Sequence, residues 1–109
     1  MRSAGRVTFL RIPEIDWVEA ADYYVCLHTA GRSHLLRRTL ADMEKDLDPK
    51  SFCRIHRSTI VNIERVRELR TDSNGEYEVV LQDATALRLS RGYRHALQTL
   101  LGERNASKQ

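Results

Sequence analysis

The stretch from residue 52 to residue 63, FCRIHRSTIVNI, constrains the fold more than any other part of the chain. Its two ends are apolar, whereas its centre holds Arg54, His56, Arg57, Ser58 and Thr59. A surface loop does not need the apolar ends, and a plain core strand does not carry a polar and basic centre. The pattern therefore predicts a strand, a sharp connection that presents hydrogen-bond donors, and a second strand that holds the connection rigid.

Arginine and histidine donors on a rigid frame suit phosphates and the edges of nucleic-acid bases. The charge distribution agrees, because residues 50–70 hold six Lys and Arg against two acids, a local charge of +4 in a chain of +3 overall. A basic hairpin whose charges are only solvated would have the same composition. Residue chemistry alone leaves both interpretations open.

The rest of the chain alternates between short strand patterns and turn signals, with two helical patterns. In residues 24–29, Val25 and Leu27 alternate with polar neighbours, which is typical of a half-buried strand. Further strands are predicted over 7–12, 17–20, 34–37, 66–70, 77–82 and 86–89. Apolar residues recur at helical spacing over 39–47, with Thr39 as N-cap, and over 90–101, with Ser90 as N-cap and Gly102 as the stop. This order predicts a mainly β protein of antiparallel sheets, with one short internal helix and a short C-terminal helix.

The 109 residues are enough for one domain with a modest core. We expect a linker stub at 1–6, the domain at 7–102 and a frayed tail at 103–109. No apolar run approaches the roughly 18–20 residues that span a membrane, and no signal-peptide pattern opens the chain, so we expect a cytoplasmic protein. Cys26 and Cys53 each lie in a strand-like segment, where reduced thiols are the default.

The sequence offers no recognisable catalytic or metal-binding motif. The four histidines, among them His28 and His34 across a predicted hairpin, lack HExxH or paired CxxC spacing. No Gly-x-Ser-x-Gly motif and no glycine-rich phosphate loop is present. We therefore expect neither an enzyme nor a metal or other cofactor, and treat these histidines as ordinary strand or surface residues.

Arg91 and Arg94 lie in the first turn of the predicted last helix, where cations oppose the helix dipole. A helix N-terminus with two arginines suits a phosphate, although both side chains could equally be solvated. Among the aromatic residues that could stack on bases, we expect Trp17 in the core and Tyr23 exposed.

Several motifs taken together make the chain similar to a known family. They are IDWVEA at 15–20, RTL at 38–40, LDP at 47–49, FCRIHRS at 52–58, IVN at 60–62 and LSRGY at 89–93. In this order they resemble the LytTR DNA-binding domain, the output module of many bacterial response regulators in two-component systems. The resemblance covers nearly the whole chain. It implies elongated antiparallel β-sheets and sequence-specific binding of double-stranded DNA by a transcription regulator, with loops in successive major grooves.

The resemblance also implies which residues meet DNA. The motif positions Arg57 and Arg91 are expected to donate to guanine edges. The other expected contacts are Asp22 and Tyr23 in the first loop, Ser58, Ser90, and the phosphate or framing residues His56, Arg54, Lys50 and Arg94. Such domains read paired direct repeats with two protomers per site, and the domain alone is expected to be monomeric.

Three departures from the family pattern matter. Thr59 replaces a larger residue, Ala84 follows Asp83 where glycine is usual, and Tyr23 replaces a small polar residue. These departures concern the packing under the central turn, the 83–84 turn and the base contacts of the first loop. The competing interpretation is a β-rich protein-interaction module whose basic face binds an acidic partner.

Overall fold

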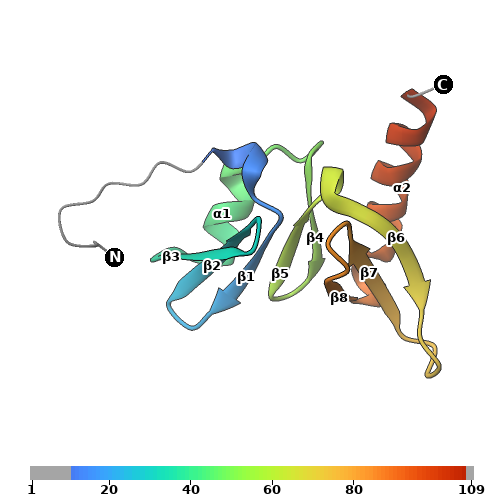
Figure 1. Ribbon diagram of the computed structural model, residues 1–109, viewed down its shortest axis with the longest axis horizontal. Coiled ribbons are helices and arrows are strands. Elements are labelled where there is room, and N and C mark those ends of the chain that lie inside the picture. The colour runs from blue at the N-terminus through green and yellow to red at the C-terminus, as the bar shows by residue number, and fades with distance from the viewer. Residues whose placement is uncertain (1–10, 108–109) are drawn as a thin grey trace.

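The computed structural model describes residues 11–107, and their elements form two antiparallel sheets and two α-helices (Figure 1). The five-stranded sheet has the order β3-β2-β1-β5-β4, and the three-stranded sheet has the order β6-β7-β8. The strands are β1 Trp17–Ala21, β2 Tyr24–Thr29, β3 Arg32–Leu36, β4 Phe52–His56, β5 Thr59–Asn62, β6 Val66–Thr71, β7 Tyr77–Leu81 and β8 Ala86–Leu89. The helices are α1 Leu40–Asp46 and α2 Arg91–Ser107, with short 3-10 helices at Ile12–Glu14 and Ile63–Arg65.

Two apolar cores lie on opposite faces of the five-stranded sheet. Alternation along a strand sends Ile60 to one face and Val61 to the other, and both are almost fully buried. The first core joins this sheet to α1 through Val18, Val25, Leu27, Leu40, Met43, Leu47, Phe52 and Ile60, with Ile15. The second core joins it to the three-stranded sheet and α2 through Cys53, Ile55, Val61, Ile63, Val79, Leu81, Leu87, Leu89 and Leu97. Trp17, which we expected in the core, packs partly buried against this second core.

Turn and cap residues explain where most elements begin and end. The β2–β3 hairpin closes through Ala30 and Gly31, whose φ values of 39° and 81° match the type I′ turn that suits twisted strands. The hydroxyl of Thr39 accepts from the backbone N–H of Asp42 at 3.0 Å and caps α1 as expected. Ala84 has a φ of 75°, so the loop between β7 and β8 holds alanine in a region that favours glycine.

Asn62 fixes the junction between the two sheets. Its side chain is buried, donates to the carbonyl of Ile15 at 2.8 Å and accepts from the backbone N–H of Glu64 at 2.9 Å. A buried amide with both ends satisfied specifies one geometry for the chain that passes from β5 to β6. Asn62 is therefore a structural residue.

The structure differs from the sequence-based expectations at both ends. Residues 7–10 of the first predicted strand lie outside the described residues, as do residues 1–6, and Ile12 belongs to a 3-10 helix. Gly102 does not end the last helix, because α2 continues to Ser107. A glycine costs a helix interior about 1 kcal/mol but stops it only when it takes a positive φ, and Gly102 has no such φ. None of the helices in the described residues is long and apolar enough to cross a membrane.

Both cysteines are reduced, and their surroundings differ. Burial, with a smaller contribution from Glu44, raises the pKa of Cys53 from 9.0 to about 11.

The unfolded chain therefore loses the proton of the Cys53 thiol at lower pH than the folded chain, and the free energy of unfolding should fall between pH 9 and pH 11. The loss attributable to this thiol is at most about 2–3 kcal/mol. Urea unfolding of the wild type and of Cys53→Ala between pH 9 and pH 11 measures this loss. The stability difference between the two proteins should shrink as the pH rises, and a constant difference would contradict the assignment.

Candidate nucleic-acid interface

The connection between β4 and β5 is a short turn at Arg57 and Ser58, and His56 organises it from within. The backbone N–H of Ser58 donates to Nδ1 of His56 at 3.2 Å, and the Ser58 hydroxyl lies 2.9 Å from the same nitrogen. Because Nδ1 accepts these contacts, a neutral His56 carries its proton on Nε2. The turn thus holds one imidazole N–H available as a donor.

Arg54 braces the same turn. Its guanidinium donates to the carbonyl of His56 at 3.0 Å and to the carbonyl of Arg57, and it forms an ion pair with Glu44 of α1 at 2.8 Å. These contacts use most of the N–H donors of Arg54, and Glu44 offsets its positive charge. Arg54 therefore acts as a framing residue, one of the two roles expected for it. The partner Glu44 gave no signal in the sequence, because it comes from a different element.

Two backbone hydrogen bonds tie this turn to its neighbours. The N–H of Ala20 in β1 donates to the carbonyl of Ser58 at 2.9 Å. The N–H of Ser90, directly before α2, donates to the carbonyl of Ile55 in β4 at 2.8 Å. The β1–β2 turn, the β4–β5 turn and the start of α2 are therefore fixed relative to one another.

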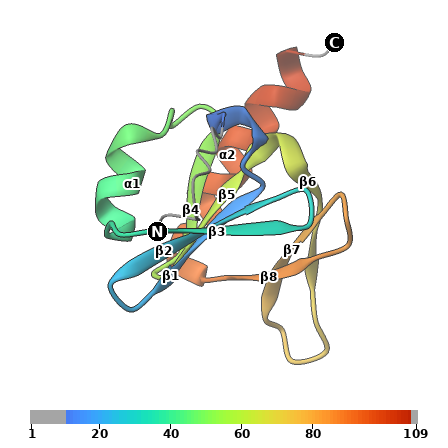
Figure 2. The same ribbon diagram turned by 60° about the vertical axis from the view of Figure 1, so that its left-hand side comes forward.

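These three segments lie along one side of the molecule. In Figure 1 the β1–β2 turn, the β4–β5 turn and the start of α2 follow one another across the lower part, and Figure 2 shows them at the same low level from another direction. We call residues 22–23, 57–58 and 90–91 the loop edge. The sequence predicted that these residues act together, and the structure brings them together.

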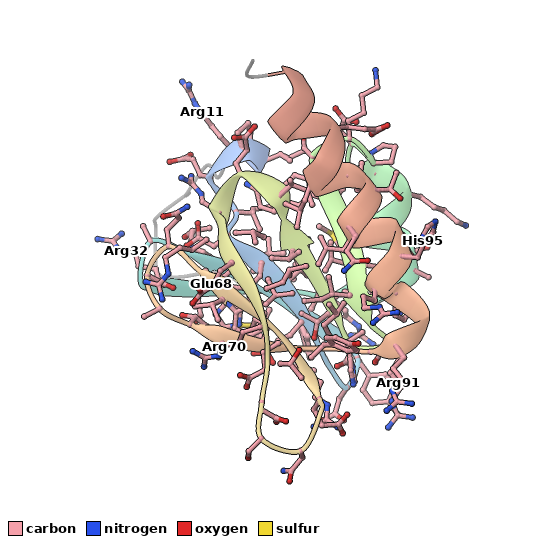
Figure 3. All side chains as sticks on the ribbon, turned by 90° about the vertical axis from the view of Figure 1, so that its right-hand side faces the viewer. Arg11, Arg32, Glu68, Arg70, Arg91 and His95 are labelled. Carbon is pink, nitrogen blue, oxygen red and sulfur yellow. The ribbon has the colours of Figure 1, made fainter. Side chains whose placement is uncertain are left out.

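Arg57 and Arg91 are the free cations of the loop edge. Both are exposed, and within residues 11–107 neither guanidinium has a hydrogen-bond or ion-pair partner. The bond between Ser90 and Ile55 limits their Cα separation to roughly 20 Å by chain length alone. Figure 3 shows Arg91 projecting away from the molecule at the start of α2. Two unpaired guanidinium groups on one edge give it a local positive potential.

The β1–β2 turn adds an acid and an aromatic ring. Asp22 has a φ of 58°, in the left-handed region that aspartate enters more readily than most residues. The neighbouring Tyr23 is 79% exposed, as expected from the sequence. Ala21 pairs with Tyr24, so the hairpin carries Asp22 and Tyr23 at its tip.

Two other expected site residues have different surroundings. Arg94 donates to the hydroxyl of Tyr77 and lies 4.7 Å from the centre of the same ring, so β7 holds this cation near the start of α2. Lys50 is exposed but precedes β4, whereas the turn follows it. Five strand residues, roughly 15 Å, separate these two ends. The structure thus keeps Arg94 beside the loop edge and Lys50 away from it.

A cleft lies away from the loop edge. It encloses about 670 Å³, and its lining mixes Glu14, Asp16 and Asp83 with Arg32 and Arg65. Hydrogen bonds from Thr85 lower the pKa of Asp83, which keeps that carboxylate charged. The three carboxylates would repel phosphate groups, so this cleft is not the candidate nucleic-acid interface.

Comparison with known proteins gives one family. The family model described as the LytTr DNA-binding domain matches residues 5–102. The sensory transduction protein LytT of Bacillus anthracis is 30% identical over 95 residues, which cover 87% of this chain and 39% of that protein. The CO-responsive transcriptional regulator RcoM of Rhodospirillum rubrum is 36% identical over 67 residues, 62% of this chain and 28% of that protein. The chain thus spans about two fifths of the length of LytT.

A solved structure has the same fold. It is the LytTr DNA-binding domain of a putative methyl-accepting/DNA response regulator from Bacillus cereus, with a TM-score of 0.76 and 22% sequence identity. The match covers 85% of each chain. This likeness supports the two-sheet architecture.

Proposed function

Because the chain belongs to the LytTR DNA-binding domain family, whose members are DNA-binding regulators and not enzymes, we propose that its loop edge reads duplex DNA in a sequence-specific manner. The turns of the loop edge enter successive major grooves. The surrounding protein is a transcriptional response regulator of a bacterial two-component system, and it acts in the cytoplasm.

The observation that carries this proposal is the pair of free guanidinium groups on one edge. Arg57 follows a strand and Arg91 starts a helix, yet the Ser90–Ile55 hydrogen bond limits the distance between their backbones. A fixed pair of forked donors suits bidentate contacts to O6 and N7 of guanine, each worth about 1–3 kcal/mol of base discrimination.

The dimensions of the molecule are compatible with successive grooves. Its longest Cα extent is 45 Å, whereas one turn of duplex DNA measures about 34–36 Å. The three segments of the loop edge follow one another across the molecule, so one copy is long enough to meet more than one groove (Figure 1). Two copies, each monomeric in isolation, occupy a pair of direct repeats.

The remaining residues of the site either contact DNA or hold other residues in place. Asp22 and Tyr23 provide an acceptor and a stacking face at the first groove, and the Nε2–H of His56 donates to a phosphate. Ser90 and the first backbone N–H groups of α2 bind a phosphate. Arg54 and Arg94 hold their neighbours in place through Glu44 and Tyr77. Lys50 is left out of the contact set because it lies at the other end of β4.

Selection from random duplexes, followed by binding at several salt concentrations, tests the proposal. We expect enrichment of one motif, and a specific affinity about 10³–10⁷ times the affinity for scrambled DNA. The logarithm of the binding constant should fall linearly with the logarithm of salt concentration. Equal affinity for every duplex would instead favour the second candidate function, a basic β module that binds acidic partners.

A further inference from the structure

One cluster of metal-ligand side chains lies outside the loop edge. Glu19, Cys26 and His28 each offer one ligand atom, and these atoms all lie within 4.8 Å of one another on the β1–β2 hairpin. It is the one such group within the described residues. We propose that these three side chains form a zinc site.

Strand pairing creates the cluster. Glu19 lies directly opposite Cys26, and Trp17 lies directly opposite His28. Side chains two residues apart share a face, so Cys26 and His28 point to the same side of the sheet as Glu19. All three are half-buried, which leaves one side of the site open to water. Sequence spacing gave no such signal, because the ligands come from paired strands instead of a local motif.

The donor set suits zinc. Zn²⁺ binds thiolate, imidazole and carboxylate ligands, and a site with three protein ligands keeps a fourth position for water. Hard ions such as Mg²⁺ prefer oxygen ligands alone. Zinc bond lengths place neighbouring ligand atoms about 3.3–3.8 Å apart in a tetrahedron. To reach these distances, the present contact of 2.8 Å between His28 and Glu19 must widen, and any ligand atoms as far apart as 4.8 Å must move closer.

The surroundings of His28 already orient its ring for this role. The imidazole stacks on Trp17, with ring centres 3.9 Å apart and planes 10° from parallel. Its Nδ1 lies 3.3 Å from the Ser33 hydroxyl, whereas Nε2 faces Glu19. In the metal-free chain Nε2 donates its proton to the Glu19 carboxylate. Zinc binding requires the other tautomer, in which the proton is on Nδ1 and donates to Ser33, and the lone pair of Nε2 is directed into the cluster. Zinc then takes the place between Nε2 and Glu19, and the Cys26 thiol releases its proton to water.

A cobalt titration of the untagged, reduced and metal-free chain tests the site, since Co²⁺ bound by a thiolate gives a charge-transfer band. We expect one Co²⁺ per chain, a thiolate-to-cobalt band and displacement by Zn²⁺. Cys26→Ser and His28→Gln should each weaken binding at least about a hundredfold, and Ser33→Ala about tenfold. Folding of each variant is checked by circular dichroism.

Matched controls separate this site from general thiol or imidazole binding. Cys53→Ala removes the other cysteine, which is buried in the second core, and His34→Gln removes the histidine on the opposite face of the hairpin. Both variants should bind Co²⁺ with the affinity and the thiolate-to-cobalt band of the wild type. The proposal is overturned if the wild type binds no stoichiometric Co²⁺, or if the band persists in folded Cys26→Ser. These readouts involve no DNA, so they do not depend on the proposed function.

Discussion

Arg57→Ala and Arg91→Ala are each expected to weaken binding to the selected duplex about 5- to 150-fold, corresponding to about 1–3 kcal/mol. Each variant should also relax preference at one base position, because a bidentate contact to guanine carries information that a phosphate contact lacks. Both side chains are exposed and free of internal partners within residues 11–107, so folding should be unaffected. Fluorescence anisotropy with the selected duplex and its single-base variants measures both effects.

Arg32→Ala is the matched control for this pair. Arg32 is also an exposed arginine without an internal partner in the described part of the chain, but it starts β3 and lines the cleft (Figure 3). Its charge is far enough from the loop edge for salt to screen it, so binding should change little. If the folded Arg57 and Arg91 variants bind the selected duplex as tightly as Arg32→Ala does, the assignment of these two residues is wrong.

Leu97→Ala should lower the free energy of unfolding by about 2–5 kcal/mol. Leu97 is fully buried and anchors α2 in the second core, which also contains Ile55 and Leu89. Its truncation removes apolar contacts and leaves a cavity between the helix and both sheets. Since small domains have only about 5–15 kcal/mol of stability, this change threatens the helix start that carries Arg91. Urea unfolding followed by circular dichroism measures it.

Gln98→Ala provides the control from the next residue of the same helix. Gln98 is exposed, and its replacement should change stability by no more than about 0.5 kcal/mol. Equal stability of Leu97→Ala and Gln98→Ala would show that α2 does not depend on the second core. In that case the position of Arg91 would need another explanation.

Local sequence patterns predicted where strands lie, but they did not predict which strands pair with one another. Alternation predicted β2 with its observed bounds, because one face of Tyr24–Thr29 is buried and the other is not. The end of α2 was predicted wrongly, since Gly102 adopts helical geometry instead of a C-cap. The division into two sheets depends on which strands pair, and the pairing of β1 with β5 joins residues about forty apart. No local pattern encodes such a contact.

The loop edge was predicted from motifs, whereas its internal bracing was not. Two motifs, FCRIHRS and LSRGY, predicted Arg57 and Arg91 as site residues. Nothing in either motif indicated that the backbone of Ser90 would hydrogen-bond to Ile55. The ion pair of Arg54 with Glu44 and the contact of Arg94 with Tyr77 depend on tertiary packing. Sequence therefore identified the cations, and the structure separated the free ones from those that hold the frame.

An NMR titration of the ¹⁵N-labelled chain with the selected duplex tests the central claim most directly. The largest amide shifts should fall at residues 22–23, 56–58 and 90–92, the three segments that the backbone hydrogen bonds of Ser58 and Ser90 tie together. Shifts concentrated instead around the cleft, at residues 29–34 and 81–83, would contradict the claim that guanidinium groups on the loop edge read DNA.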